Sequence, residues 1–261
     1  MSATTRPPVL FVHGGGLGAW IWERWRARFA EHGYATSAVD LRGHGDSPAT
    51  YRAATVADYV DDVRAAVDTL DAPPVLVGHS MAARVLQRLI DDDASFPAAV
   101  FLAPVPLDGL PRHLGAVQML RHPICAARSF RTGDMEPMFR APGLDRAAFF
   151  SPAVDDATLE EFRARIYGEA LGIYLRELPA AVQLRTPLPI PTLVASARFD
   201  RLRIETHRRD AERLGADFVV LDDVGHNLMI DAGWRAAADV TAAWLDRACS
   251  ARLEGNSRTN L

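Results

Sequence analysis

The sequence predicts an α/β protein with about six mostly parallel strands, helices on both faces of the sheet, and a helical segment inserted after the fourth strand. Two observations carry this prediction. Short apolar runs alternate with helical stretches, which is typical of a parallel sheet buried on both faces. Residues 107–186 interrupt the alternation, because this stretch has no convincing strand pattern and is bracketed by prolines.

The expected strands are short apolar runs that end in turn residues. The first, at residues 9–12, runs directly into a glycine-rich turn at residues 13–18. Helices are expected where apolar residues recur with a 3.6-residue period, with Thr55 as an N-cap and Gly33 as a helix stop. The remaining strands are expected at residues 34–39, 75–77, 99–102, 192–195 and 218–221, and the helices at 20–31, 56–70, 81–90, 156–167, 169–178, 205–214 and 234–249.

This alternation divides the chain into a core and an insertion. Residues 1–106 and 187–249 form the expected α/β core, and residues 107–186 form a helical cap over the sheet. The polar stretch 250–261 is expected to be a flexible tail. The insertion carries ten arginines and ten acidic residues together with many phenylalanine, tyrosine and methionine side chains. It therefore predicts a mainly apolar cover that does not steer a charged substrate.

The composition excludes several kinds of chemistry. The chain has 261 residues, 49% of them hydrophobic, and all 29 basic residues are arginine. Without lysine there is no Schiff-base chemistry, no pyridoxal-phosphate attachment and no phosphate-binding P-loop. The only two cysteines, Cys125 and Cys249, make neither a disulfide framework nor a metal knuckle. We expect no cofactor and no metal.

The charge and hydropathy patterns also restrict the partners. A net charge of −4 argues against nucleic acid, which requires a concentrated basic face. No apolar run approaches the roughly 20 residues that span a bilayer, so no membrane span is expected. Residues 1–8 have no apolar signal core, which predicts a cytoplasmic protein. The expected partner is a small, apolar molecule, and the oligomeric state stays open.

The strongest chemical motif is Gly78-His79-Ser80-Met81-Ala82, which lies between a buried strand and a helix. A serine on a sharp strand-to-helix turn has its hydroxyl exposed above the sheet, and its neighbours must be small for the turn to close. The motif G-x-S-x-G has alanine in its last position here. In this context we interpret Ser80 as a nucleophile in preference to an ordinary helix N-cap.

A serine nucleophile needs a base and an acid that orients the base. His226 follows the strand expected at 218–221, and Asp200 follows the strand expected at 192–195. The carboxyl ends of parallel strands meet at one edge, so Ser80, Asp200 and His226 should converge there. Asp108, after the preceding strand, is the alternative acid, and we favour Asp200.

The glycine-rich turn predicts an oxyanion hole. Two backbone N–H groups must point at the developing negative charge, one of them from the residue after the nucleophile. Met81 supplies that one, and Gly15 is the expected second donor with Gly16 in reserve. Gly16 is thus also a candidate substrate contact.

The same turn matches a dinucleotide-binding fingerprint. Gly14, Gly16 and Ala19 fit G-x-G-x-x-G/A, and Asp40 lies near the spacing of a ribose-binding acid. That interpretation leaves the order of Ser80, Asp200 and His226 as a coincidence and places Trp20 where a helix must approach a pyrophosphate. We therefore reject it.

Together these motifs resemble the α/β-hydrolase superfamily. The resemblance covers nearly the whole chain, from residues 13–16 and the loop 41–47 to Ser80, Asp200 and His226. Only eight residues precede the first strand, so the chain resembles the short-N-terminus branch that includes plant methylesterases and hydroxynitrile lyases. Those lyases carry a lysine directly after the catalytic histidine, where this chain has Asn227. The segment around Ser80 is also similar to that of type II thioesterases.

The resemblance implies a serine hydrolase, carboxylesterase-like, that cleaves a small, mainly apolar ester, lactone or thioester through an acyl-enzyme on Ser80. The alternative is a lyase, cyclase or cofactor-independent oxygenase that uses His226 as a general base, or a ligand-binding receptor, because the fold hosts all of these. Arg84, one helical turn after Ser80, is a further candidate substrate contact. It is expected either to pair with a nearby carboxylate or to bind an anionic substrate group.

Overall fold

Six strands form one fully parallel sheet in the order β2-β1-β3-β4-β5-β6. The computed structural model describes residues 6–47 and 50–259. The sheet confirms the predicted fold class, with a strand at each expected position. The strands are β1 (Val9–Val12), β2 (Thr36–Val39), β3 (Val75–His79), β4 (Ala99–Leu102), β5 (Thr192–Ala197) and β6 (Asp217–Leu221).

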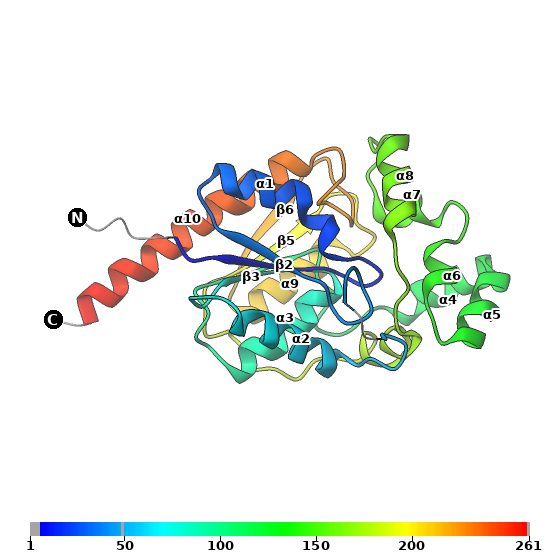
Figure 1. Ribbon diagram of the computed structural model, residues 1–261, viewed down its shortest axis with the longest axis horizontal. Coiled ribbons are helices and arrows are strands. Elements are labelled where there is room, and N and C mark those ends of the chain that lie inside the picture. Colours follow the sequence, from blue (N-terminus) through cyan, green and yellow to red (C-terminus); the bar gives the residue numbers. More distant parts are fainter. Residues whose placement is uncertain (1–5, 48–49, 260–261) are drawn as a thin grey trace.

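Helices cover both faces of this sheet (Figure 1). The 3₁₀ turn η1 (Ala19–Trp22), α1 (Glu23–Glu31) and α10 (Trp234–Thr259) lie on one face, and α2 (Val56–Asp68), α3 (Met81–Asp92) and α9 (Ile204–Leu214) lie on the other. Strand β1 shows why both faces must be apolar: Val9 and Phe11 pack in the core on the α1 side, whereas Leu10 and Val12 pack in the core on the α2 side. Successive strand side chains point to opposite faces, so a buried central strand is apolar throughout.

The insertion between β4 and β5 is helical, as its sequence predicts. It contains α4 (Arg112–Arg121), α5 (Pro123–Thr132), α6 (Glu136–Phe139), α7 (Leu144–Phe149), α8 (Asp156–Arg165) and a π-helical turn η2 (Ile173–Glu177). Figure 1 shows these helices at the end of the molecule away from both termini. In place of the helix expected at 169–178, the structure has only the short turn η2.

Helix α10 is longer than its sequence pattern indicates. We expected it to end at Cys249 and the following residues to form a flexible tail, but the helix continues to Thr259. The stretch 250–254 is polar, yet alanine, arginine, leucine and glutamate are all good helix formers and no proline stops them. No helix within the described ranges is long and apolar enough to cross a membrane.

Candidate active site

Ser80 lies on a sharp turn between β3 and α3, with a backbone φ of 53° and ψ of −113°. Non-glycine residues rarely adopt a positive φ, and such strain persists only where neighbours enforce it. Here the Ser80 N–H donates to the carbonyl of Leu102 (2.9 Å), and the Ser80 carbonyl accepts from Val105 N–H (3.2 Å). The turn is thereby fixed to the end of β4.

Small residues let this turn close against α3. A Cβ on Gly78 would lie 2.6 Å from Leu86 Cδ1 and 3.2 Å from the carbonyl carbon of Ala82. Ala82 itself is fully buried, so its methyl group fits where the motif usually has glycine. The sharp turn at Ser80 therefore forms although the last position of the motif is alanine.

His226 joins Ser80 to Asp200. Its Nε2 lies 2.9 Å from Ser80 Oγ, and its Nδ1 lies 2.9 Å from Asp200 Oδ2. Because the carboxylate can only accept, Nδ1–H donates to Asp200, and Nε2 is left to accept from the Ser80 hydroxyl. Asp200 Oδ1 in turn accepts from the N–H of Leu202 (3.0 Å), which fixes the carboxylate. The three residues thus form one hydrogen-bonded chain.

Two backbone bonds align the loops that carry Asp200 and His226. The N–H of Arg198 donates to the Leu221 carbonyl (2.9 Å), and the N–H of Phe199 donates to the Val224 carbonyl (3.0 Å). The loop after β5 is thus paired with the loop after β6. Asp108, the alternative acid, instead pairs with Arg213 at 2.8 Å, and its side chain is 81% exposed. The geometry therefore favours Asp200.

Two buried histidines support the surrounding backbone. His79 Nε2 lies 2.9 Å from the carbonyl of His226 and donates to it. Burial lowers the pKa of His79 well below its ordinary value, with a smaller contribution from His226. His13 Nε2 accepts from Leu41 N–H (3.1 Å), and burial, followed by the nearby His44, lowers the pKa of His13 to about 3. Both rings are neutral and act as spacers that hold loops at the site.

Asp231, which the sequence motifs do not reveal, organises the loop of His226. This carboxylate is fully buried and accepts four hydrogen bonds, from Gly225 N–H (2.7 Å), Ala232 N–H (2.7 Å), Ser151 N–H (2.6 Å) and Ser151 Oγ (2.8 Å). It therefore joins the His226 loop to the insertion. The available sign in the sequence is an aspartate five residues after the histidine, directly after the apolar run 228–230.

The predicted oxyanion donors lie beside Ser80. Gly15 lines a small cavity of about 30 Å³ together with Ser80 and His226, and Met81 is the first residue of α3. A Cβ on Gly14 would lie 2.7 Å from His79 Nδ1 and 3.2 Å from Ser80 Cβ, so the turn packs too closely on the residues around the serine for a side chain. The two amides remain the predicted donors.

Gly16 does not match its predicted role. It lines neither of the two cavities that contain Ser80, and a Cβ there would lie 2.5 Å from Phe139 Cε2. Its carbonyl accepts from the N–H of Tyr167 (2.8 Å), which joins the turn to the insertion. Gly16 therefore ties the turn to the insertion and lies outside the two cavities next to Ser80.

Tyr174, on the π-helical turn η2, is a second residue that the sequence did not reveal. Its ring lines both cavities that contain Ser80, and a Cβ on Gly15 would lie 2.5 Å from its hydroxyl oxygen. Within the described ranges the hydroxyl has no protein hydrogen-bond partner. Burial, and then the charge of Glu169, raise the pKa of Tyr174, so the hydroxyl keeps its proton. It is available to donate to a bound substrate beside the predicted oxyanion hole.

The larger cavity at Ser80 is apolar. Its volume is about 220 Å³, and the insertion supplies most of its walls. Among the described residues, the charged side chains that line it are Asp200, which bonds His226, and Arg201, whose Nε donates to the Ala147 carbonyl at 2.9 Å. The apolar walls include Leu114, Met119, Met135, Met138, Leu144 and Phe149.

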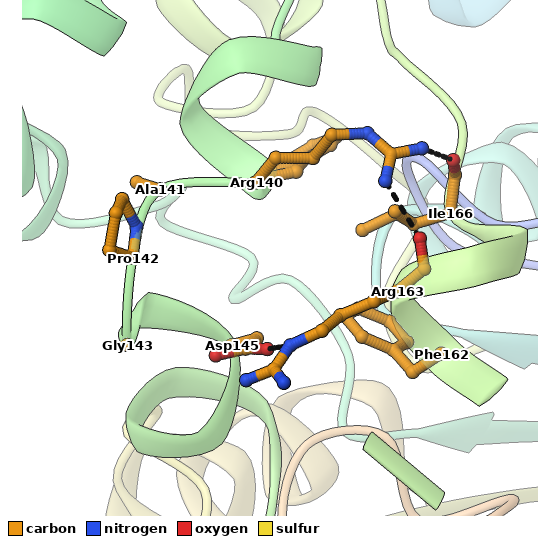
Figure 2. A pocket seen from close by; sticks show the side chains of 9 residues that line it. Arg140, Ala141, Pro142, Gly143, Asp145, Phe162, Arg163 and Ile166 are labelled. Atoms are coloured by element: carbon orange, nitrogen blue, oxygen red, sulfur yellow. Dashed lines mark hydrogen bonds and ion pairs between the residues drawn. The ribbon is translucent and has the colours of Figure 1, made fainter. Parts of the chain in front are cut away.

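A separate cavity of about 380 Å³ lies within the insertion (Figure 2). It shares Phe139, Phe162 and Ile166 with the small cavity at Ser80, so these side chains form the wall between the two spaces. Figure 2 shows Arg140 donating to the carbonyls of Arg163 (2.7 Å) and Ile166 (2.8 Å). These hydrogen bonds of Arg140 hold segments of the insertion together next to the site.

Arg84 corrects a prediction. The residue is 3% exposed, and its guanidinium donates to the carbonyls of Pro106 and Ala180, each at 2.9 Å. It forms no ion pair with a described carboxylate and lines neither cavity at Ser80. Both expectations for Arg84 were therefore wrong. Arg84 thus joins the segment after β4 to the segment that leads back to β5. Local sequence spacing does not reveal this contact between distant segments.

The dinucleotide interpretation also fails on geometry. Asp40 accepts from Ala19 N–H (2.6 Å) and Asp46 N–H (3.3 Å), so it anchors two turns in place of a ribose. Among the described residues there is no group of three or more histidine, cysteine or acidic side chains that could hold a metal ion.

A parallel sheet that brings a serine, a histidine and an aspartate from three strand ends into one hydrogen-bonded chain defines the α/β-hydrolase class of fold. The profile of the Alpha/beta hydrolase family matches residues 9–243, so the chain belongs to that family.

Individual relatives agree with this assignment. An uncharacterised protein of Mycobacterium tuberculosis is 30% identical over 203 residues, which cover 76% of this chain and 52% of that protein. The chain thus spans about half the length of this curated relative. A probable esterase of Oryza sativa is 37% identical over 116 residues, 41% of each chain. An esterase of Thermogutta terrifontis has the same fold, with a TM-score of 0.72 at 21% identity over 94% of this chain and 91% of that one.

Proposed function

We propose that this protein is a serine hydrolase that cleaves a small, mainly apolar ester, lactone or thioester through an acyl-enzyme on Ser80. The observation that carries the proposal is the hydrogen-bonded chain from Ser80 through His226 to Asp200, which opens into an apolar cavity. The esterases among its relatives support the same type of reaction.

The geometry supports a two-step mechanism. Ser80 Oγ attacks the acyl carbon while His226 Nε2 takes its proton, and Asp200 stabilises the imidazolium through Nδ1–H. The backbone N–H groups of Gly15 and Met81 donate hydrogen bonds to the developing oxyanion. His226 then gives the proton to the departing alcohol or thiol, and water repeats the sequence to release the acid.

The cavity supports the substrate class. At about 220 Å³ it is smaller than the roughly 300–1,000 Å³ typical of sites for drug-sized ligands. Its methionines adapt to different apolar shapes, and within the described chain no unpaired acidic group faces an ester. The acyl or alkyl part should therefore be apolar and of limited length.

A series of p-nitrophenyl esters of rising chain length tests the proposal. We expect kcat/KM to rise while each added methylene is buried in the cavity and to fall once the chain exceeds it. No turnover at any length would contradict a carboxylesterase-like activity.

The same series separates hydrolysis from a general-base reaction without a nucleophile. Ser80→Ala and His226→Ala should both lose turnover by about 10⁴-fold or more, because triad members act as a unit. If only the histidine variant loses turnover, the acyl-enzyme is wrong and His226 acts alone.

A further inference from the structure

The charge of the insertion is balanced overall but not locally. Residues 109–133, which we call the basic hairpin, contain four arginines, two histidines and no acidic residue. The chain has 29 arginines in all against 33 acidic residues, so everything outside the basic hairpin is distinctly acidic. The basic hairpin therefore carries a net positive charge, whereas the rest of the chain carries a net negative charge.

The four arginines are free to meet a partner. They are all exposed, and none forms an ion pair with a described carboxylate. Elsewhere many arginines are paired, as in the contacts of Arg28 with Asp239 and Arg42 with Asp62. The unpaired residues are Arg112, Arg121, Arg128 and Arg131.

Large apolar side chains are exposed between these arginines. Leu120 is 81% exposed and Ile124 is 70% exposed, and Val117 and Phe130 are also exposed. Helix α4 has no buried residue at all. Exposed apolar groups are ordinary when scattered, but a contiguous set usually marks an interaction surface.

The helix geometry puts the two kinds of side chain together. On α5, Ile124, Arg128 and Arg131 are spaced at i, i+4 and i+7, so they share the face opposite the buried Ala126 and Ser129. Leu120 lies in the last turn of α4, shortly before α5 begins. Exposed apolar side chains next to arginines can insert among the lipids of an anionic bilayer while the arginines contact the headgroups.

The basic hairpin also adjoins the catalytic cavity. Leu114, Gln118 and Met119, on the side of α4 away from Leu120, line the cavity that contains Ser80. Figure 1 shows α4 and α5 at the end of the molecule away from both termini. A surface that receives this end would lie next to the cavity.

We propose that the basic hairpin docks the protein on an anionic lipid surface, with Leu120 and Ile124 inserted among the lipids and the arginines bound to their phosphate groups. Charge complementarity favours this partner over a neutral surface, since the hairpin is the basic part of an acidic protein. The docking does not depend on the reaction proposed above.

Cosedimentation of the intact protein with vesicles tests the docking. Vesicles of phosphatidylcholine with phosphatidylglycerol should bind the protein, and vesicles of phosphatidylcholine alone should bind it much more weakly. Raising the salt from about 0.1 M to about 1 M shortens the Debye length from about 10 Å to about 3 Å and should release it.

Two variants and a matched control locate the contact. Arg121→Gln/Arg128→Gln/Arg131→Gln should bind anionic vesicles about 100-fold more weakly, since each arginine contributes about fivefold near such a surface. Leu120→Ser/Ile124→Ser should lose at least about tenfold, because each substitution removes three side-chain carbons that would be buried among the lipids. The control Val240→Ser/Arg247→Gln changes one exposed apolar residue and one exposed arginine on α10, outside the basic hairpin. It should bind as the wild type does.

Three results would overturn the proposal. In the first, the protein does not bind anionic vesicles; in the second, it binds neutral vesicles equally well; in the third, both hairpin variants bind as the wild type does. Sedimentation velocity adds a fourth: a wild-type dimer that Leu120→Ser/Ile124→Ser converts to a monomer would show that a second copy of the chain covers this face.

Discussion

The strained backbone of Ser80 and the two 2.9 Å contacts of His226 place the reacting groups before any substrate binds. The strain is held by bonds from β4 and by the close packing of Gly78 on α3. Pre-organisation of this kind lowers the entropy cost of the reaction. Substitution of single side chains at the site therefore tests the proposed mechanism most directly.

The acid of the triad can be tested by comparing two aspartates. Asp200→Asn should lower kcat by about 10⁴-fold, because an amide in place of the carboxylate favours the wrong tautomer of His226. Asp108→Asn should leave kcat within about twofold, since Asp108 only pairs with Arg213 at the surface. Steady-state kinetics on the best p-nitrophenyl ester measures both, and the reverse ranking would assign the acid to Asp108.

Tyr174→Phe tests the hydroxyl beside Gly15. We expect kcat/KM to fall by about tenfold with little change in melting temperature, because the lost hydrogen bond is made to substrate and not to protein. Tyr51→Phe is the matched control: that hydroxyl donates to Asp134 outside both cavities at Ser80, so it should affect stability and not turnover. Unchanged kinetics in Tyr174→Phe would show that the hydroxyl does not reach the substrate.

At the scale of elements, the loops after β5 and β6 and the insertion are held together by contacts between distant segments. The backbone pairing of the two loops aligns Asp200 with His226, and Asp231 fixes the His226 loop to the insertion. A Cβ on Gly225 would lie 2.5 Å from the carbonyl carbon of Phe150, so this approach requires glycine. The histidine is thus positioned by the insertion as well as by the sheet.

Asp231→Asn tests this positioning. The amide N–H₂ would replace one oxygen and leave two of the four donors without an acceptor, which should cost about 2–4 kcal/mol of unfolding free energy. We also expect kcat to fall by about tenfold or more as the His226 loop shifts. Asp222→Asn, on an exposed residue of the same loop that pairs with Arg198, should change neither quantity appreciably. Urea unfolding and steady-state kinetics check both variants, and equal effects would rule out the proposed anchoring.

The sequence was informative where structure depends on local pattern and chain order. Strand–helix alternation predicted the sheet, and the order of Ser80, Asp200 and His226 predicted which residues meet. It was not informative about contacts between distant segments that no motif marks. Arg84 meets the carbonyls of Pro106 and Ala180, and no local spacing indicates that pairing. Polar composition at 250–259 likewise suggested a tail, although the helix formers in that stretch extend α10.

For the whole molecule, buried histidines connect stability to pH. His13 is neutral and buried in the folded state with a pKa of about 3, whereas its ordinary pKa is 6.5. The unfolded state therefore binds more protons between these values, and the stability present above about pH 6.5 is lost as the pH falls toward about 3. The pKa values of His79 and His207 are also lowered by burial, so they act in the same direction.

Unfolding by urea at about pH 7 and about pH 5 measures this dependence. At about 1.4 kcal/mol per pH unit, His13 alone should account for roughly 2 kcal/mol of the loss. His13→Gln cannot titrate, so its loss should be smaller by about that amount even if its stability at pH 7 is lower. An equal loss in the variant would show that His13 is not responsible.

The most direct test of the serine mechanism is covalent labelling with a fluorophosphonate, which reacts with an activated serine. We expect the wild-type protein to be labelled at Ser80, with the modified residue identified by mass spectrometry, and labelling to disappear in Ser80→Ala. Asp108→Asn should label as the wild type does. Labelling that persists in Ser80→Ala, or a wild-type protein that does not react, would contradict the assignment of Ser80 as the nucleophile.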